Sequence, residues 1–142
     1  GTPAGVTADE TAKPKAGGRT KKCEPVPNPR IVTIGEKRWK VDSKMLDYYA
    51  THIKALDELG WVSKWKAEDG SRKGFKIGGL SCGNDAWLAG LRNGDIVLTV
   101  NGTKVGSILE GIAAYAKHRK ADVIALEIMR KGEIRFHTYR MQ

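Results

Sequence analysis

The sequence predicts an α+β protein in which short strands form a partly open β-barrel around two main helices. Apolar residues recur at helical spacing in two segments, residues 43–59 and 107–117. Short runs rich in β-branched and aromatic residues surround these segments, and glycine-containing turns separate the runs. Strands that are mixed with helices in this order are typical of the α+β class.

Residues 1–30 are predicted to be a flexible tether, and residues 31–142 are predicted to be one folded domain. The first segment is rich in glycine, proline, alanine, threonine and lysine and has almost no large apolar side chain. It therefore cannot bury enough surface to offset the entropy lost on ordering, and we predict that it is a disordered tail. Its last part, EPVPNPR, contains prolines that favour extended, partly stiff conformations.

The folded part is predicted to begin with a strand and helix extension. The run IVTIGEKRWKVD fits one or two short strands with a turn near Gly35. Asp42 or Ser43 can cap a following helix over residues 43–59, which Gly60 ends. The apolar face of this helix is predicted to consist of Met45, Leu46, Tyr49, Ile53, Leu56 and Leu59.

The middle of the chain is predicted to alternate strands and turns. WVSKWKAEDG reads as a strand that ends in the turn Asp69-Gly70, and GFKIGGL reads as a second short strand. NDAWLAGL fits one or two helical turns capped by Asn84 or Asp85. The turn RNGD then leads into the buried strand IVLTV, and a second turn follows at NGTKV.

The last third of the sequence is predicted to be a helix followed by a hairpin. Ser107 and Glu110 form a capping-box pattern, and basic residues at 117–120 suit the negative end of the helix dipole. Residues 123–129 and 134–139 then read as two strands that flank a turn at residues 130–133.

The formal net charge of +9 and the pI of about 9.7 raise the question of an anionic partner. The lysines and arginines are spread along the whole chain, with no arginine-rich arm, so we expect no nucleic-acid partner. A basic surface that binds nucleic acid or anionic lipid stays open as an alternative, and its affinity would fall steeply with salt.

Residues with chemically active side chains do not form a recognisable catalytic or metal-binding pattern. Cys23 and Cys82 are too few for a structural zinc site, and they are either a disulfide or two unrelated thiols. The three histidines have no carboxylate or serine at a catalytic spacing, and Asp95 in a turn more commonly bonds to local backbone. We therefore expect no catalytic residue, no metal site and no cofactor. The sequence also has no apolar stretch long enough to span a membrane and no visible signal peptide.

The ordered string GFKIGGL, AWLAGLRNGDIVLTVNGTKV, SILEGIAAYAK and VIALEIMRKGE resembles a bacterial PDZ domain. The resemblance covers about residues 59–140. With the long helix ahead of the first strand and the segment GSRKGFKI, it is similar in particular to the C-terminal periplasmic PDZ domain of the C component of bacterial type II secretion systems.

This resemblance implies a non-catalytic protein-interaction domain of the inner-membrane platform, located in the periplasm and tethered to the bacterial inner membrane by a segment that precedes these residues. The implied partners are a secretion-system component or an exported substrate, and self-association is left open. The alternative is a regulatory PDZ domain of a membrane-bound or periplasmic protease. No Ser-His-Asp domain with a Gly-Asn-Ser-Gly-Gly turn is present in the sequence.

By the same resemblance, an extended peptide would add to a strand edge, and its side chains would enter a groove between that strand and the helix at residues 107–117. The predicted start of the strand is Leu59, Gly60, Trp61 and Val62, whose backbone amides could hold a peptide carboxylate. The competing interpretation is that Gly60 only caps the preceding helix.

The helix at residues 107–117 carries two apolar stripes. One consists of Ile108, Ile112 and Tyr115, and we expect these larger residues to face the core. The second consists of Leu109, Ala113 and Ala116, and we expect it to line a shallow groove for the peptide. The alternative is a helix that is buried more widely, with both stripes in the core. Of the tryptophans, one of Trp61 and Trp65 is expected to lie partly exposed beside the groove.

Overall fold

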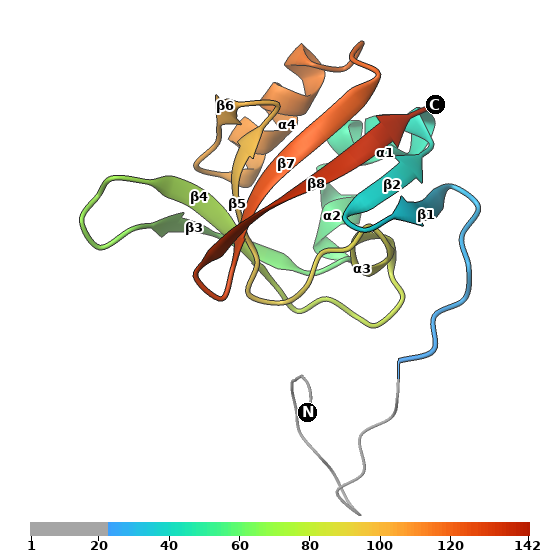
Figure 1. Ribbon diagram of the computed structural model, residues 1–142, viewed down its shortest axis with the longest axis horizontal. Helices are drawn as coiled ribbons and strands as arrows, with labels where there is room; N and C mark the ends of the chain where they lie inside the picture. Colours follow the sequence, from blue (N-terminus) through green and yellow to red (C-terminus); the bar gives the residue numbers. More distant parts are fainter. Residues whose placement is uncertain (1–22) are drawn as a thin grey trace, which may run out of the picture.

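The structure is a computed structural model that describes residues 23–142. It confirms the α+β class: one open eight-stranded sheet is combined with four helices, and the helices lie between and beside its strands (Figure 1). The elements follow the order β1 Ile31–Gly35, β2 Arg38–Val41, α1 Ser43–Thr51, α2 Ile53–Asp57, β3 Trp61–Lys66, β4 Lys73–Gly78, α3 Asp85–Leu88, β5 Ile96–Val100, β6 Thr103–Lys104, α4 Ile108–Lys117, β7 Val123–Arg130 and β8 Glu133–Met141.

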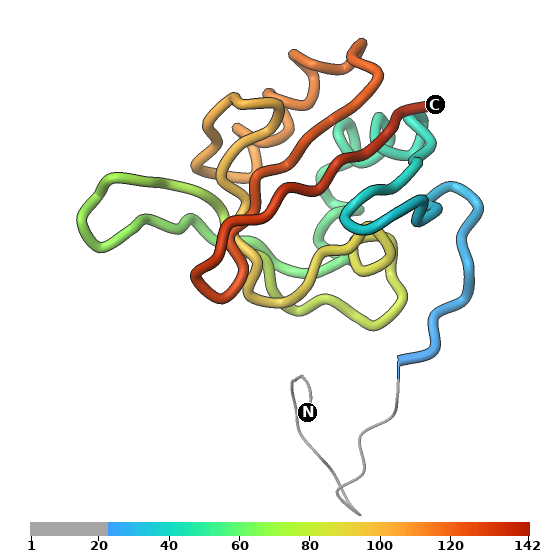
Figure 2. The backbone as a smooth tube through the Cα atoms, in the orientation of Figure 1, coloured from blue at the N-terminus to red at the C-terminus, as the bar shows by residue number. Residues whose placement is uncertain are grey.

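The strands pair in the order β1-β2-β8-β7-β5-β4-β3, and β6 pairs with β5. All pairs are antiparallel except β2 with β8. Within the described part of the chain this order leaves β1 and β3 as the two edge strands. The hairpin of β3 and β4 projects from the rest of the molecule, as the chain path also shows (Figure 2).

Most of the predicted turns and caps are present. Asp42 caps α1 by accepting the Lys44 amide at 2.9 Å, and Asn84 caps α3 by accepting the Trp87 amide at the same distance. Ser107 caps α4, and the Glu110 carboxylate reaches back to the Gly106 amide at 2.7 Å. These local hydrogen bonds explain why the sequence alone identified where these helices begin.

The predicted single helix over residues 43–59 is wrong, because the structure has two helices that are separated at His52. The Thr51 hydroxyl donates to the Asp47 carbonyl oxygen at 2.9 Å, and His52 Nδ1 lies 2.9 Å from the Tyr48 carbonyl oxygen. These side chains take carbonyl oxygens at the end of α1, and His52 leaves the helical conformation with φ of −127° and ψ of 74°.

The prediction that Gly60 ends the helix is also wrong. Helix α2 ends at Asp57, with Glu58 as its C-cap. A Cβ atom at position 60 would collide with the carbonyl oxygen of Gly78 and lie 2.9 Å from Leu80 Cδ2. Glycine is therefore required here because two backbone segments approach each other closely.

The end of the predicted tether is joined to the domain by a disulfide bond between Cys23 and Cys82, whose Cα atoms are 5.7 Å apart. The Asn28 side chain also donates to the Asp85 carboxylate at 3.0 Å. Residues 23–30 are thus attached to the folded part at two points. Residues 1–22 of the predicted tether lie outside the described residues.

Candidate functional site: an apolar pocket beside an edge strand

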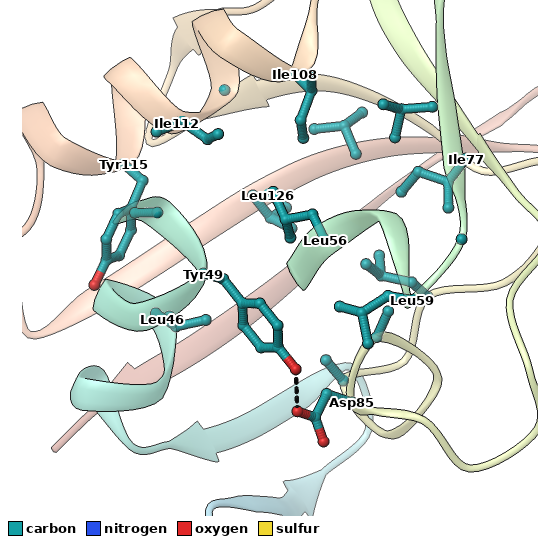
Figure 3. A pocket seen from close by; sticks show the side chains of 18 of the residues that line it. Leu46, Tyr49, Leu56, Leu59, Ile77, Asp85, Ile108, Ile112, Tyr115 and Leu126 are labelled. Carbon is teal, nitrogen blue, oxygen red and sulfur yellow. Dashed lines mark hydrogen bonds between the residues drawn. The ribbon is translucent and has the colours of Figure 1, made fainter. Parts of the chain in front are cut away.

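An apolar pocket of about 300 Å³ lies between the edge strand β3, helix α4 and helices α1 and α2 (Figure 3). Its floor comes from the core-facing side of the sheet, and its walls come from the helices and from the segment before β3. The labelled lining residues include Leu46, Tyr49, Leu56, Leu59, Ile77, Asp85, Ile108, Ile112, Tyr115 and Leu126.

The segment Leu59 to Val62 lines this pocket, as its predicted place beside the groove requires. The Leu59 amide donates to the Leu56 carbonyl oxygen at 3.0 Å, and the Leu59 carbonyl oxygen accepts from Asn84 at 2.7 Å. One of the amides expected to hold a peptide carboxylate is therefore already used within the protein. The binding role of these residues stays a prediction.

Trp61 and Trp65 lie opposite glycines across the β3–β4 pair. Their partners in the register are Gly78 and Gly74, and a Cβ atom at Gly78 would collide with the Trp61 ring. The Trp61 ring therefore covers a strand position that has no side chain of its own. Trp61 is 54% exposed and lines the pocket, which agrees with the expectation that one of this pair lies partly exposed beside the groove.

The expectation that the larger stripe of α4 faces inward is confirmed: Ile108 and Tyr115 pack against the core. Together with Ile112 they also line the pocket. The other stripe is solvent-exposed and does not line this pocket, and its role in peptide binding stays a prediction; it consists of Leu109, Ala113 and Ala116. The pocket is present because α1 and α2 leave space against the larger side chains of α4 and do not fill it. The helix therefore presents its bulky face to the pocket.

Helix α1 is fixed to α4 at the edge of the pocket. The Tyr115 hydroxyl donates to Asp47 at 2.8 Å, and Arg119 donates two hydrogen bonds to the same carboxylate at 2.8 and 2.9 Å. The hydrogen bond from Arg119, with that from Tyr115, lowers the pKa of the Asp47 carboxyl below its usual value. This link holds two walls of the pocket together at neutral pH.

A second connection joins α1 to α3. The Tyr49 hydroxyl points across the pocket and donates to the Asp85 carboxylate (Figure 3). Burial and this hydrogen bond raise the pKa of the Tyr49 hydroxyl. The sequence predicted that Tyr49 belongs to the apolar face of α1. It did not predict the hydrogen bond to Asp85, because the two residues are far apart in the chain.

Asp95 has a structural function. Its carboxylate is fully buried and accepts the Arg92 amide at 2.9 Å, which agrees with the predicted bond to local backbone. It also forms an unpredicted ion pair with Arg130, at 2.7 and 2.8 Å. Both partners are therefore committed to the fold, and Asp95 is not accessible to a ligand.

His137 is also buried, on the core side of β8. Arg135 Nε donates to His137 Nε2 at 2.9 Å, so that nitrogen carries no proton and Nδ1 can donate to the Tyr139 hydroxyl at 3.1 Å. Burial, with the nearby Arg135 charge, lowers the pKa of His137 to about 3. The imidazole is therefore neutral in the folded protein.

The stability of the protein is expected to fall on mild acidification because of His137. Below its ordinary pKa of 6.5 this histidine takes up a proton in the unfolded chain but stays neutral in the folded chain until the pH nears its folded pKa. Between about pH 7 and pH 5 the free energy of unfolding should drop by about 2 kcal/mol from this residue. Urea unfolding at both pH values measures the change.

The variant His137→Asn should lose most of this pH dependence, even if it is less stable at neutral pH. The exposed His52 provides a matched control, and His52→Asn should keep the full dependence. A wild-type free energy of unfolding that is the same at both pH values would contradict the interpretation.

Among residues 23–142 no group of three or more histidine, cysteine, aspartate or glutamate side chains is arranged to hold a metal ion. No helix in this part of the chain is long and apolar enough to cross a membrane.

The fold and the pocket define a small module with an edge strand and an adjacent apolar groove, and the chain is similar to PDZ domains. Among solved structures, it is similar to the PDZ domain of EpsC from Vibrio cholerae, with 17% identity and a TM-score of 0.43, over 68% of this chain and 91% of that one. It is also similar to the PDZ domain of the pullulanase C protein of the type II secretion system from Klebsiella pneumoniae in complex with fatty acid. That match has 20% identity and a TM-score of 0.38, over 63% of this chain and 98% of that one.

In sequence, the chain is 24% identical over 111 residues to a serine protease Do-like HtrA from Lactobacillus helveticus. The match includes 76% of this chain and 27% of that protein, so the chain spans about a quarter of the length of this relative. No family model matches the sequence.

Proposed function

We propose that this chain is a non-catalytic interaction domain that binds an extended segment of a partner protein along β3. The observation that carries the proposal is the position of a free strand edge directly beside an apolar pocket. A partner strand would pair with the backbone of β3, and one of its apolar side chains would enter the pocket. Backbone pairing supplies affinity, and the pocket supplies selectivity.

We further propose that the domain belongs to the inner-membrane platform of a type II secretion system, where it contacts an exported substrate or another component. The support is the sequence string from GFKIGGL to VIALEIMRKGE. The disulfide between Cys23 and Cys82 supports an oxidising compartment, and we assign the domain to the periplasm. The anchor that would tether it to the membrane belongs to this proposal.

The pocket can be tested by filling it. Ile112→Trp is expected to weaken binding of a strand-forming peptide at least about tenfold, because the larger side chain occupies the space that the peptide residue needs. Leu109→Trp is the matched control. Leu109 is 62% exposed on the same helix and does not line the pocket, so the affinity of this variant for the peptide should change less than about twofold. Fluorescence anisotropy with labelled peptides measures both, and circular dichroism verifies the fold.

If the exposed stripe of α4 binds the partner, Leu109→Trp should weaken binding and Ile112→Trp should not. That outcome would overturn the pocket as the binding site. The same pair in the full-length protein tests the secretion part of the proposal. In cells that lack the protein, the full-length wild type and Leu109→Trp should restore export of substrate protein into the medium, and Ile112→Trp should not.

The second candidate function is regulation of a protease, and the similarity to a serine protease Do-like HtrA favours it. In that case the full-length protein would degrade an unfolded substrate such as casein, and a peptide bound in the pocket would change the rate. Proteolysis by the full-length protein would replace the secretion proposal with this one.

A further inference from the structure

Beyond the apolar pocket, the face of the β3–β4 hairpin that lines it continues toward the tip of the hairpin. Residues directly opposite each other in an antiparallel pair have their side chains on the same face of the sheet. Val62 pairs with Ile77 and Lys64 pairs with Phe75, and both of these partners are buried and line the pocket. The face that carries Val62 and Lys64 is therefore the face toward α4.

Three lysines lie on this face where the apolar lining ends, and we call Lys64, Lys66 and Lys73 the basic strip. Lys66 is directly opposite Lys73 in the register, and all three residues are exposed. Lys73 is also next to the beginning of α4, because a Cβ atom at Gly106 would lie 3.5 Å from Lys73 Cβ. The basic strip thus lies on the hairpin of β3 and β4, which projects from the rest of the molecule (Figure 1).

The charges of the basic strip are not neutralised within the described part of the chain. Both salt bridges there, Asp47 with Arg119 and Asp95 with Arg130, lie elsewhere. Two acidic groups of this region have other hydrogen-bond partners: Glu110 accepts the Gly106 amide, and Asp69 accepts the Ser71 amide and hydroxyl.

Like charges opposite each other weaken a strand pair, so Lys66 and Lys73 cost the hairpin some stability. Lysines on an edge strand also discourage aggregation, which is a sufficient reason for Lys64 and Lys66 on β3. Lys73 lies at the outer end of β4, where the register pairs it with β3 but not with β5, so the argument for a ligand is the position of all three charges on one face. A face beside the pocket that carries three positive charges, none of them in a salt bridge with another described residue, fits a ligand with negative charges.

We propose that the groove selects an extended segment in which the apolar residue that enters the pocket is preceded by acidic residues at alternate positions. This inference rests on the proposed function. An added strand pairs most stably in the antiparallel direction, so the residues before the apolar one lie beside Lys64 and then Lys66. Every second side chain of the added strand faces the groove, where a carboxylate would meet the basic strip.

The test uses three labelled peptides with the same apolar residue, whose alternate preceding positions carry glutamate, serine or lysine. The glutamate peptide is expected to bind roughly threefold to tenfold more tightly than the serine peptide, because exposed charge pairs contribute modestly. The lysine peptide should bind most weakly. The advantage of the glutamate peptide should shrink at high salt, because these pairs are exposed to solvent.

Variants of the protein locate the effect. Lys64→Glu and Lys73→Glu should remove or reverse the preference for the glutamate peptide. Lys76→Glu is the matched control, because Lys76 is exposed on the same hairpin but pairs with Ser63 on the opposite face. An equal loss in Lys76→Glu would overturn the basic strip and leave only an effect of net charge.

Two further results separate this inference from the proposed function. If all three peptides bind equally and Ile112→Trp still weakens them, the charge preference is overturned while the pocket stands. If none of the peptides binds, the proposed function fails and the inference fails with it.

Discussion

Replacing Arg130 with methionine is expected to lower the free energy of unfolding by about 3–5 kcal/mol, because it leaves a buried carboxylate without its cation. Asp95 has no exposed surface, and two nitrogens of Arg130 contact its oxygens. Among the described residues, the variant keeps the Arg92 amide as the one hydrogen-bond donor to the Asp95 carboxylate. Arg130 also donates to the Gly90 carbonyl oxygen at 2.8 Å, so the loop before β5 loses a second contact.

Urea unfolding followed by circular dichroism measures the loss, and a double-mutant cycle tests its cause. Asp95→Asn combined with Arg130→Met removes both charges, so the double variant should be more stable than the sum of the single losses predicts. Arg119→Met is the control, because it breaks an ion pair whose side chains are 57% and 29% exposed, and it should leave stability nearly unchanged. Equal losses in Arg130→Met and Arg119→Met would contradict the importance of burial.

Breaking the disulfide bond is expected to lower the free energy of unfolding by about 2–4 kcal/mol, because Cys23 and Cys82 close a long loop. Their separation of 59 residues includes the whole segment from β1 to β4, and the bond restricts this loop in the unfolded chain. The double variant Cys23→Ala with Cys82→Ala should show the loss without reductant.

Reductant provides the matched comparison. It should destabilise the wild type to about the level of the double alanine variant and leave that variant itself unchanged. A wild type whose unfolding curve does not respond to reductant would show that the bond contributes nothing. Mass measurement under non-reducing conditions verifies that the bond is present in the sample.

The arrangement of strands and turns could be predicted well because it depends on local chemistry. Asp42, Asn84 and Ser107 cap helices through bonds to residues close in sequence, and Asn101-Gly102 adopts positive φ at its turn. Strand β5 is apolar except for Thr99 because both of its faces are largely covered, and this pattern was visible in the sequence as IVLTV. Such features need no knowledge of distant parts of the chain.

The site was harder to predict, because the side of a helix that faces a cavity depends on its neighbours. The amphipathic pattern of α4 indicated that its larger residues face inward, but it could not show that a cavity lies on that side. The cavity follows from the position of α1 and α2, which stand against Ile112 and Tyr115. The break at His52 was missed for a different reason. The side chains of Thr51 and His52 contact the carbonyl oxygens of Asp47 and Tyr48, which in a continuous helix would accept backbone amides of the next turn.

By itself, the sequence determined the class of the fold, the order of its elements and the strand that begins at Trp61, because periodicity, caps and turns act over a few residues. Only the tertiary structure decided which face of α4 lines the pocket, which acid meets Arg130, and that Cys23 is bonded to Cys82. Each of these depends on residues far apart in the chain. These contacts depend on how the helices and loops pack on the sheet, and a local sequence pattern does not predict that packing.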